Sequence, residues 1–322
     1  MSTVTSQSVP ASAVDFYSRQ ALNRRRTWLL LAGFVLFFLL LGLGLDTVWG
    51  GFLSARGEPL PLATLGTLGL AAAMSLSAYF GGARLVMASL CAQPLNLNDP
   101  EHRQLYNIVT EMALAAGLPQ PRVYLIPDPA PNALATGRDP RHAVLAVTQG
   151  LLNVLDREET QGVVAHEMAH IGNRDTLTMT LVAILLGGVV MLADWARRVL
   201  FLSSDRRRGN PLVFLVVVLL VAVTPLLSRL MAMAVSRQRE YLADATAAQL
   251  TRNPLGVAHA LEKIGAATSP LQAATRGTAH LFISNPLRRR VDERQGQLAD
   301  LLSTHPPLAQ RIAILRAMVH AA

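Results

Sequence analysis

The chain contains a single cysteine, Cys91, among its 322 residues. One cysteine cannot form an intrachain disulfide, so covalent cross-linking plays no part in holding the fold. No histidine lies close to Cys91 in the sequence, which argues against a nucleophilic thiol. We expect Cys91 to pack at the end of the apolar helix that precedes it.

Charged residues are also scarce. They make up 16% of the sequence against 51% hydrophobic residues, and the mean hydropathy is +0.34. This balance is too apolar for an ordinary soluble domain. The formal net charge of +8 would suit a nucleic acid or an anionic lipid as a partner. The arginines, however, flank apolar runs and do not alternate with aromatic residues, so the pattern argues against nucleic-acid binding.

Long apolar runs occur at two places in the first third of the chain. Residues 27–45 are nineteen uncharged residues, enough to cross the hydrocarbon core at about 1.5 Å per residue. No clean signal-peptidase site follows, so we predict an uncleaved anchor. An arginine cluster places the preceding tail, residues 1–26, in the cytoplasm, and residues 1–18 are expected to be loose. A second run, at about 62–82, returns the chain, so residues 27–91 are predicted to form a transmembrane hairpin.

Two further apolar segments, 176–193 and 211–228, have about eighteen residues each and are marginally long enough to span a membrane. If both cross, the loop between them lies outside, and it carries five arginines against two aspartates. That charge has the wrong sign for an external loop. Three interpretations stay open: the pair spans against the rule, enters the membrane without crossing it, or packs on the soluble domain.

The rest of the chain has the periodicities of a mixed soluble domain. Strands are predicted at 121–127 and 142–148, with a short edge strand in the turn-rich segment between them. Helices are predicted from apolar periodicity and end signals at 101–117, 156–175, 236–250 and 255–267, and residues 303–319 are predicted to form a turn with two prolines that leads into a helix. We expect residues 92–175 and 229–322 to form two halves of one domain, separated by the paired apolar segments, 176–228.

The segment VVAHEMAHIGNRD, residues 163–175, carries the most specific motif. On a helix His166 and His170 are one turn apart and share a face, so both imidazoles can bind one ion. Glu167 points about 100° away and can reach a water on that ion without binding the ion itself. Two ligands and one general base are the parts of a zinc hydrolase. The apolar neighbours argue against two ordinary surface histidines, since buried imidazoles need a partner.

A catalytic zinc site needs a third protein ligand. A third histidine six residues after His170 is not available, because that position is Thr176. The remaining type of ligand is a carboxylate from another helix, and Glu240 in SRQREYLAD is the best candidate. Asp244, one turn later, would accept the free N–H of a ligand histidine. Ion pairing of these carboxylates with nearby arginines is the alternative interpretation.

The segments HEMAHIGNRD, SRQREYLAD and STHPPLAQRI, in this order, resemble the HtpX family of membrane-bound zinc proteases, which are similar in turn to CAAX prenyl endopeptidases. The likeness covers roughly residues 25–318 and includes PNALATGRDP and TAHLFISNPL. It implies a mostly α-helical membrane protein, in which a gluzincin-type α+β zinc protease domain with a small sheet is fused to transmembrane helices. It also implies one Zn²⁺ per chain, bound by His166, His170 and Glu240, with Glu167 as the catalytic base.

Further roles are proposed within this resemblance. His305 and Arg311, in the THPPLAQR segment, are candidates for donating to the oxyanion that develops during peptide hydrolysis. Asn132 and Ala133 resemble a substrate-side segment of the family, where an edge strand would pair with an extended substrate. The alternatives are structural: a capping histidine, an arginine paired with a carboxylate, and a plain turn.

The resemblance implies an integral-membrane endopeptidase that cleaves misfolded or damaged membrane proteins. Its protease domain would face the cytoplasm from a bacterial inner membrane, with protein substrates and the lipid bilayer as partners. A function of another class stays open: a membrane scaffold or chaperone-like module with a structural zinc. The intact Glu167 and an open coordination position argue against it, because structural zinc sites are closed by four protein ligands. The oligomeric state and the substrate preference are not determined by the sequence.

Overall fold

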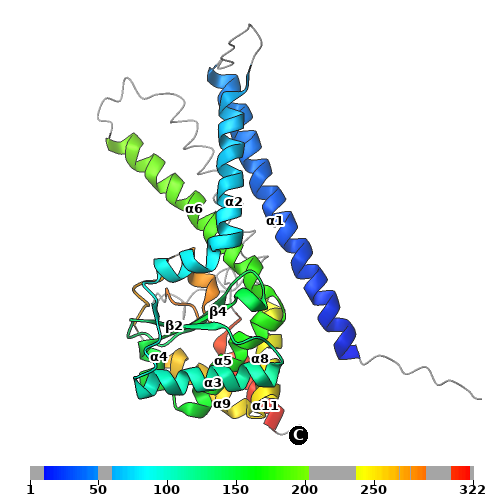
Figure 1. Cartoon of the computed structure of the whole chain (residues 1–322), viewed down its shortest axis with the longest axis vertical. Helices are drawn as coiled ribbons and strands as arrows, with labels where there is room; N and C mark the ends of the chain where they lie inside the picture. Colours follow the sequence, from blue (N-terminus) through cyan, green and yellow to red (C-terminus); the bar gives the residue numbers. More distant parts are fainter. Residues whose placement is uncertain are drawn as a thin grey trace, which may run out of the picture.

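The computed structural model of the protein describes residues 11–49, 60–202, 237–267, 269–275, 277–287 and 306–319. Within these residues helices predominate, and one small sheet lies among them (Figure 1). The strands are β1 (Gln93–Pro94), β2 (Arg122–Ile126), β3 (Ala133–Thr136) and β4 (Val144–Thr148). The longer helices are α1 (Ala11–Trp49), α2 (Leu62–Ser89), α3 (Pro100–Ala116), α5 (Arg157–Gly172), α6 (Asp175–Leu202), α8 (Arg237–Thr251), α9 (Pro254–Ala266) and α11 (Leu308–Val319). The short helices are η1 (Pro140–His142), α4 (Gln149–Val154) and η2 (Ala279–Leu281).

All the helices and strands predicted for the soluble part are present. Local signals in the sequence set where they end. Asp99 precedes α3 and its side chain accepts the N–H of Glu101, while Gly117 ends the helix in the left-handed conformation at φ 64°. Asn253 caps α9 in the same way, accepting the N–H of Gly256. The predicted edge strand is β3, which pairs antiparallel with β4.

The start of α5, the helix that carries the motif, is held by a capping box. The carboxylate of Asp156 accepts the N–H of Glu159 at 2.9 Å, and the Glu159 carboxylate accepts the N–H of Asp156 at 2.9 Å. Lys263 of α9 donates to the same Glu159 carboxylate at 2.6 Å. These contacts determine where the helix begins and therefore which turn carries the two histidines.

The sheet has the strand order β1-β2-β4-β3 and is mixed. β2 and β4 run parallel, whereas β1 and β3 are antiparallel to their neighbours. All five residues of β4 are buried, because both faces of the sheet are covered. Leu145 and Val147 face the core formed with α3, α5 and α9, while Val144 and Ala146 face a core that includes the end of α2. This order leaves β3 at the edge beside α5.

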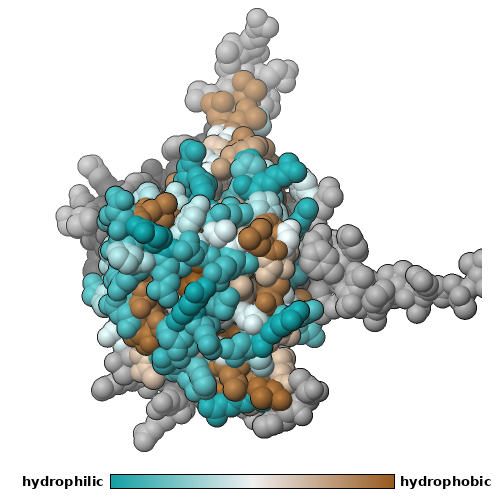
Figure 2. Space-filling model, turned by 60° about the horizontal axis from the view of Figure 1, so that its bottom comes forward, coloured by the Kyte–Doolittle hydropathy of each residue, from teal (hydrophilic) through white to brown (hydrophobic). Residues whose placement is uncertain are grey.

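Two described helical segments, Thr27–Thr47 of α1 and Leu62–Ser89 of α2, are long and apolar enough to cross a membrane. They rise together above the rest of the fold (Figure 1), and large apolar side chains such as Leu29 and Leu65 are exposed on them. The opposite end of the molecule has a mostly hydrophilic surface with small separate apolar patches (Figure 2). This contrast fits a bilayer around the two helices.

The two helices are also joined by a polar cap. Asp46, near the end of α1, is buried and accepts the backbone N–H groups of Ala63 and Thr64, each at 2.9 Å. A carboxylate at the first turn of a helix satisfies donors that have no partner within the helix. Gly42 lies against the backbone of Thr64, so a larger side chain at this position would force the helices apart.

Two local predictions were wrong. Helix α1 begins at Ala11, so part of the tail that was predicted to be loose is helical. Once the apolar run is helical, each residue added at its N-terminus gains a hydrogen bond without a new nucleation cost. Cys91 does follow the end of α2, but it is exposed and has φ 52°, instead of packing on the helix.

The first of the paired apolar segments, 176–193, falls within the single helix α6. Leu181, Leu185 and Val189 pack against α1 and α2, and Ala183 contacts the core on the sheet. The start of α6 therefore lies between the hairpin and the soluble elements. The second segment, 211–228, lies outside the described residues, so the topology of the pair stays a prediction.

Replacing Asp156 tests the capping box. Asp156→Ala should lower the free energy of unfolding by about 1 kcal/mol, because the first turn of α5 loses a side-chain acceptor. Asp156→Asn keeps a side-chain acceptor, so its free energy of unfolding should change little. Thermal unfolding of the purified full-length variants in detergent measures the difference, and equal stability of the two variants would contradict the assigned cap.

Candidate active site

Helix α5 brings His166, Glu167 and His170 together at its last two turns. His166 and Glu167 are buried, and His170 keeps a small exposed fraction. The two imidazole rings stand edge to face at an interplanar angle of 84°, and their Nε2 atoms are 3.2 Å apart. The predicted spacing of one helical turn therefore directs two ring nitrogens to one point.

Helix α8 adds a carboxylate to this point. Glu240 is buried, and its oxygens lie 3.8 Å from Nε2 of His166 and 3.7 Å from Nε2 of His170. One potential ligand atom from each of the three residues lies within 4.8 Å of the others. The structure thus brings together the three residues that the sequence offered as metal ligands, although α8 is far from α5 along the chain.

The geometry of these atoms fits a tetrahedral zinc ion. Two nitrogens at about 2.05 Å from such an ion are about 3.3 Å apart, close to the 3.2 Å between the two Nε2 atoms. The nitrogen-to-carboxylate distances of 3.7 and 3.8 Å are a few tenths of an ångström longer than this arrangement needs. Glu240 would therefore move slightly toward a bound ion.

The far side of each ring meets a carboxylate. Nδ1 of His166 is 2.9 Å from Asp244, and Nδ1 of His170 is 3.2 Å from Asp175. A proton held on each Nδ1 leaves the Nε2 lone pair for an ion. Asp244 was offered for this position by the sequence, whereas Asp175 was missed. Its position depends on the turn between α5 and α6, where Arg174 has φ 57°.

Burial and neighbouring charges shift the pKa values of Glu167 and His170 in particular. Burial raises the pKa of Glu167 to about 7, and the carboxylate of Glu240 adds to the increase. At His170 burial acts to lower the pKa, but Asp175, Glu240 and Glu167 outweigh it and raise the pKa to about 9. In the metal-free site both ring nitrogens of His170 are therefore protonated at neutral pH, and the ring is charged.

Arg311 of α11 lies behind the ligands and is fully buried. Its Nε and Nη2 donate to the two oxygens of Asp244, each at 2.7 Å, and its Nη1 donates to the carbonyl of Ile283 at 2.9 Å. Nη1 is also 3.4 Å from Glu240. At Asp244 burial opposes ionisation, but Arg311 outweighs it and lowers the pKa to about 2. The guanidinium therefore orients Asp244 and Glu240, which is the structural alternative to the predicted contact with an oxyanion.

The predicted substrate contacts at Asn132 and Ala133 also need correction. Both residues are buried, and the edge of β3 at this point pairs with the chain itself. Ile283 donates its N–H to the carbonyl of Ala133 at 3.0 Å, and the Asn132 side chain donates to the carbonyl of Ser284 at 3.0 Å. The strand edge is thus occupied where a substrate was expected. The other oxyanion candidate, His305, lies outside the described residues.

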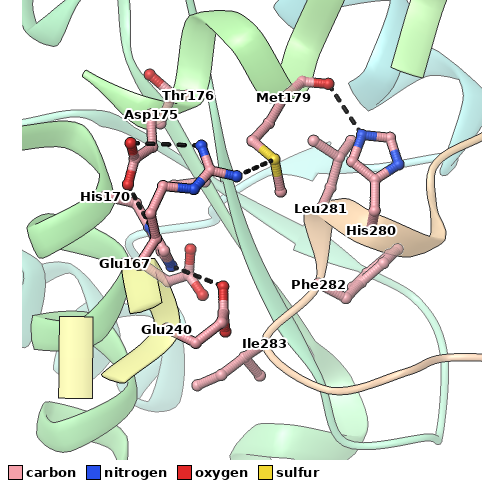
Figure 3. A pocket seen from close by; sticks show the side chains of 12 residues that line it. Glu167, His170, Asp175, Thr176, Met179, Glu240, His280, Leu281, Phe282 and Ile283 are labelled. Carbon is pink, nitrogen blue, oxygen red and sulfur yellow. Dashed lines mark hydrogen bonds and ion pairs between the residues drawn. The ribbon is translucent and has the colours of Figure 1, made fainter. Parts of the chain in front are cut away.

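A pocket opens beside Glu167, His170 and Glu240 (Figure 3). Its opposite wall contains His280, which sequence reasoning did not assign a role, and the apolar side chains of residues 281–283. The ring nitrogen Nε2 of His280 lies 3.0 Å from the carbonyl of Met179 in α6. No spacing rule links position 280 to the motif, so only the fold could place it here.

Removing the guanidinium should destabilise the site. Arg311→Met would leave Asp244 and Glu240 buried without their cation, at a cost of about 3–5 kcal/mol. The matched control is Arg316→Met on the same helix, because Arg316 forms an exposed ion pair with Glu262. Thermal unfolding measures both variants, and equal losses of stability would contradict the role assigned to Arg311.

Zinc affinity should depend on pH. Below pH 9 a bound metal must displace the proton of His170, so the apparent Kd should fall about tenfold per pH unit between pH 7 and pH 9 and level off above. Competition with a chromophoric chelator measures this dependence. Asp175→Asn removes a carboxylate that raises the pKa of His170. The apparent Kd of this variant should therefore level off at a lower pH than that of the wild type. A Kd that is constant from pH 7 to 9 would contradict the shift.

Comparisons with known proteins extend the likeness beyond the site. A protein from Thermoanaerobacter pseudethanolicus named "Protease HtpX homolog" is 42% identical over 95% of this chain and 99% of its own length. Proteins of the same name from Tropheryma whipplei and Syntrophobacter fumaroxidans are 41% and 46% identical, over 94% and 77% of this chain and 98% and 87% of their own. The predicted resemblance to the HtpX family is confirmed.

Two further comparisons are with a solved structure and with a family profile. The crystal structure of S. mikatae Ste24p has a TM-score of 0.46 at 17% identity, over 94% of this chain and 67% of that chain, a similarity too low to bear on the fold. The profile of "Peptidase family M48" matches residues 99–319, a stretch that contains every ligand candidate. With this match over most of its length and relatives above 40% identity, the chain belongs to peptidase family M48.

Proposed function

We propose that the chain is a zinc-dependent endopeptidase anchored in a membrane. The observation that carries the proposal is the position of Glu167, which lies in the pocket beside His170 and Glu240 and is not itself among the three ligand candidates. A general base must lie within reach of the water whose proton it accepts. Three protein ligands leave the fourth position of a tetrahedral ion for water or substrate, as in catalytic zinc sites.

Each residue near the pocket has a part in peptide hydrolysis. His166, His170 and Glu240 would hold the zinc, which when bound polarises a peptide carbonyl and makes a water more acidic. Glu167 accepts a proton from the attacking water and returns it to the nitrogen of the scissile bond. The backbone N–H of Ala135, in β3, faces the Glu167 carboxylate and favours its ionised form.

The residues behind the ligands act through them and do not touch the substrate. Asp244 and Asp175 orient the two imidazoles, and Arg311 orients Asp244. The pocket measures about 20 Å³, which accommodates about one water molecule. This size suits the attacking water, and a peptide would need the wall formed by residues 281–283 to move.

The proposal extends to the membrane and to the substrates. It places the protease domain on the cytoplasmic side of a bacterial inner membrane, where it cleaves misfolded or damaged membrane proteins. Helix α6 supports the link to the membrane, because Thr176 and Met179 line the pocket while Leu181 and Leu185 pack on the hairpin. A substrate segment that emerges beside α1 and α2 would lie close to the pocket. The arginines before the apolar run of α1 support the cytoplasmic orientation.

Replacing the base separates this function from a scaffold with structural zinc. Glu167→Gln should reduce casein cleavage by about 10²–10⁴-fold, because an amide cannot accept the proton of the attacking water. Zinc content should stay at about one ion per chain, since Glu167 is not among the three ligand candidates. Mass spectrometry of the purified proteins gives the zinc content, and a gel assay gives the cleavage rate.

Glu262→Gln is the matched control for this experiment. It makes the same chemical change in a partly exposed carboxylate that pairs with Arg316 at 2.6 Å, and should keep full activity. Cleavage by Glu167→Gln at the wild-type rate would contradict the assigned base. If the wild type and Glu167→Gln both contain zinc and neither cleaves casein, the result would favour the scaffold with a structural zinc.

A further inference from the structure

Helix α2 meets the soluble elements near the sheet (Figure 1), and residues of α2, β2 and the loop after β3 line a second cavity. It measures about 250 Å³ and shares no lining residue with the pocket beside Glu167. Three arginines line it: Arg84 from α2, Arg122 from the first position of β2, and Arg138 from the loop after β3. Guanidinium groups from three separate segments therefore converge on one space.

Arg138 is held in a defined position at the wall of this cavity. Its Nη2 donates to Nε2 of His142 at 2.8 Å, and its Nε is 3.4 Å from the carboxylate of Asp139. Its guanidinium carbon lies 5.4 Å from the centre of the Phe80 ring, within the range of a cation–π contact. Asp139 thus offsets the charge of Arg138, and Arg138 shapes the wall.

The other two arginines give the cavity an excess of positive charge. Over the part of the chain that the structure describes, no carboxylate lies within ion-pair distance of Arg84 or Arg122. Both side chains are exposed, so water and mobile ions reach them. A cavity with two guanidinium groups that no described carboxylate offsets is suited to an anion with several oxygens, such as a phosphate ester.

The place of the cavity along α2 matches the headgroup layer of a bilayer. About twenty residues from Leu62, at 1.5 Å each, cover the roughly 30 Å of the hydrocarbon core and end near Gly82. Arg84 follows directly. Tyr79 and Phe80 also line the cavity and are 39% and 65% exposed, as is usual for aromatic residues at a membrane interface. The cavity therefore lies at headgroup depth, on the side of the bilayer that carries the soluble elements.

The positive-inside rule explains only part of this arrangement. Arg84 follows a predicted span, so the rule alone would account for it. Arg122 and Arg138 belong to the folded domain, far along the chain from the span, and orientation in the membrane does not require them to share a cavity with Arg84. Their convergence is a property of the tertiary structure and points to a ligand.

We propose that this cavity binds the headgroup of an anionic phospholipid, with the phosphodiester paired to Arg84 and Arg122. The rings of Tyr79 and Phe80 would cover the glycerol and the first methylene groups of the acyl chains. A lipid held there joins α2 to the sheet and sets the height of the domain above the bilayer. The inference rests on the membrane anchorage proposed above, and it is independent of catalysis.

Lipid retention tests the proposal without an activity assay. The full-length protein is reconstituted into bilayers of equal phosphatidylglycerol and phosphatidylcholine, extracted in mild detergent, and its retained lipids are quantified by mass spectrometry. The wild type should retain more phosphatidylglycerol than phosphatidylcholine. Arg84→Gln/Arg122→Gln should reduce this preference roughly twenty-five-fold, because each arginine near an anionic lipid contributes about a factor of five.

A second pair of substitutions controls for net charge. Arg103 and Arg141 are exposed and do not line the cavity, so Arg103→Gln/Arg141→Gln should keep the preference. Arg84→Lys/Arg122→Lys should keep most of it, because an ammonium group still binds phosphate as a point charge. An unchanged melting temperature shows that each variant is folded. If the glutamine pair does not fold, the single variants Arg84→Gln and Arg122→Gln replace it, each with an expected loss of about fivefold.

Three results would overturn the proposal. If Arg103→Gln/Arg141→Gln loses as much of the preference for phosphatidylglycerol as the glutamine pair in the cavity, total charge would explain the preference and the cavity would not. An unchanged preference in the glutamine pair would show that these arginines bind no lipid. Binding of free glycerol phosphate in pure phosphatidylcholine bilayers, lost in the glutamine pair, would assign the cavity to a soluble anion. Failure of the anchorage itself would show separately, as protein that stays soluble without detergent.

Discussion

The buried ion pair of Arg311 and Asp244 is the contact on which the proposed site depends. Arg311 donates to both carboxylate oxygens at 2.7 Å, and Asp244 in turn lies 2.9 Å from Nδ1 of His166. Neither charge could remain in this interior without the other, because an isolated buried ion is far less stable than one in water. The pair therefore joins α11, α8 and α5 in one arrangement and orients a proposed zinc ligand.

The second imidazole is connected to α1, which contains the first candidate membrane span, by a comparable series of contacts. His170 lies 3.2 Å from Asp175, the first residue of α6, and the side chain of Asn23 in α1 donates to that same carboxylate. Asn23 also donates to the carbonyl of Asn173 at 3.2 Å. Helix α1, just before its candidate span, thus contacts the group that orients His170. The proposed active site and the hairpin are parts of one connected structure, not a soluble unit with a separate anchor.

Most of the helices and strands were predictable because their signals are local. Asp156 and Glu159 form a capping box three residues apart, and Gly117 ends α3 because it adopts positive φ easily. Contacts between distant segments were not predictable. The pairing of Ile283 with the edge of β3, and the enclosure of Arg311, involve residues with no fixed spacing from their partners.

The sequence by itself determined the spacing of His166, Glu167 and His170, since helical geometry alone puts the two imidazoles on one face. It also determined the two apolar helices and identified Glu240 and Asp244 as carboxylates of the right kind. Only the tertiary structure decided that α8 brings Glu240 to the histidines, that Asp175 orients His170, and that Arg311 lies behind the ligands. The physical reason is that hydrogen bonds and buried charges act over a few ångströms in space, whatever the distance along the chain.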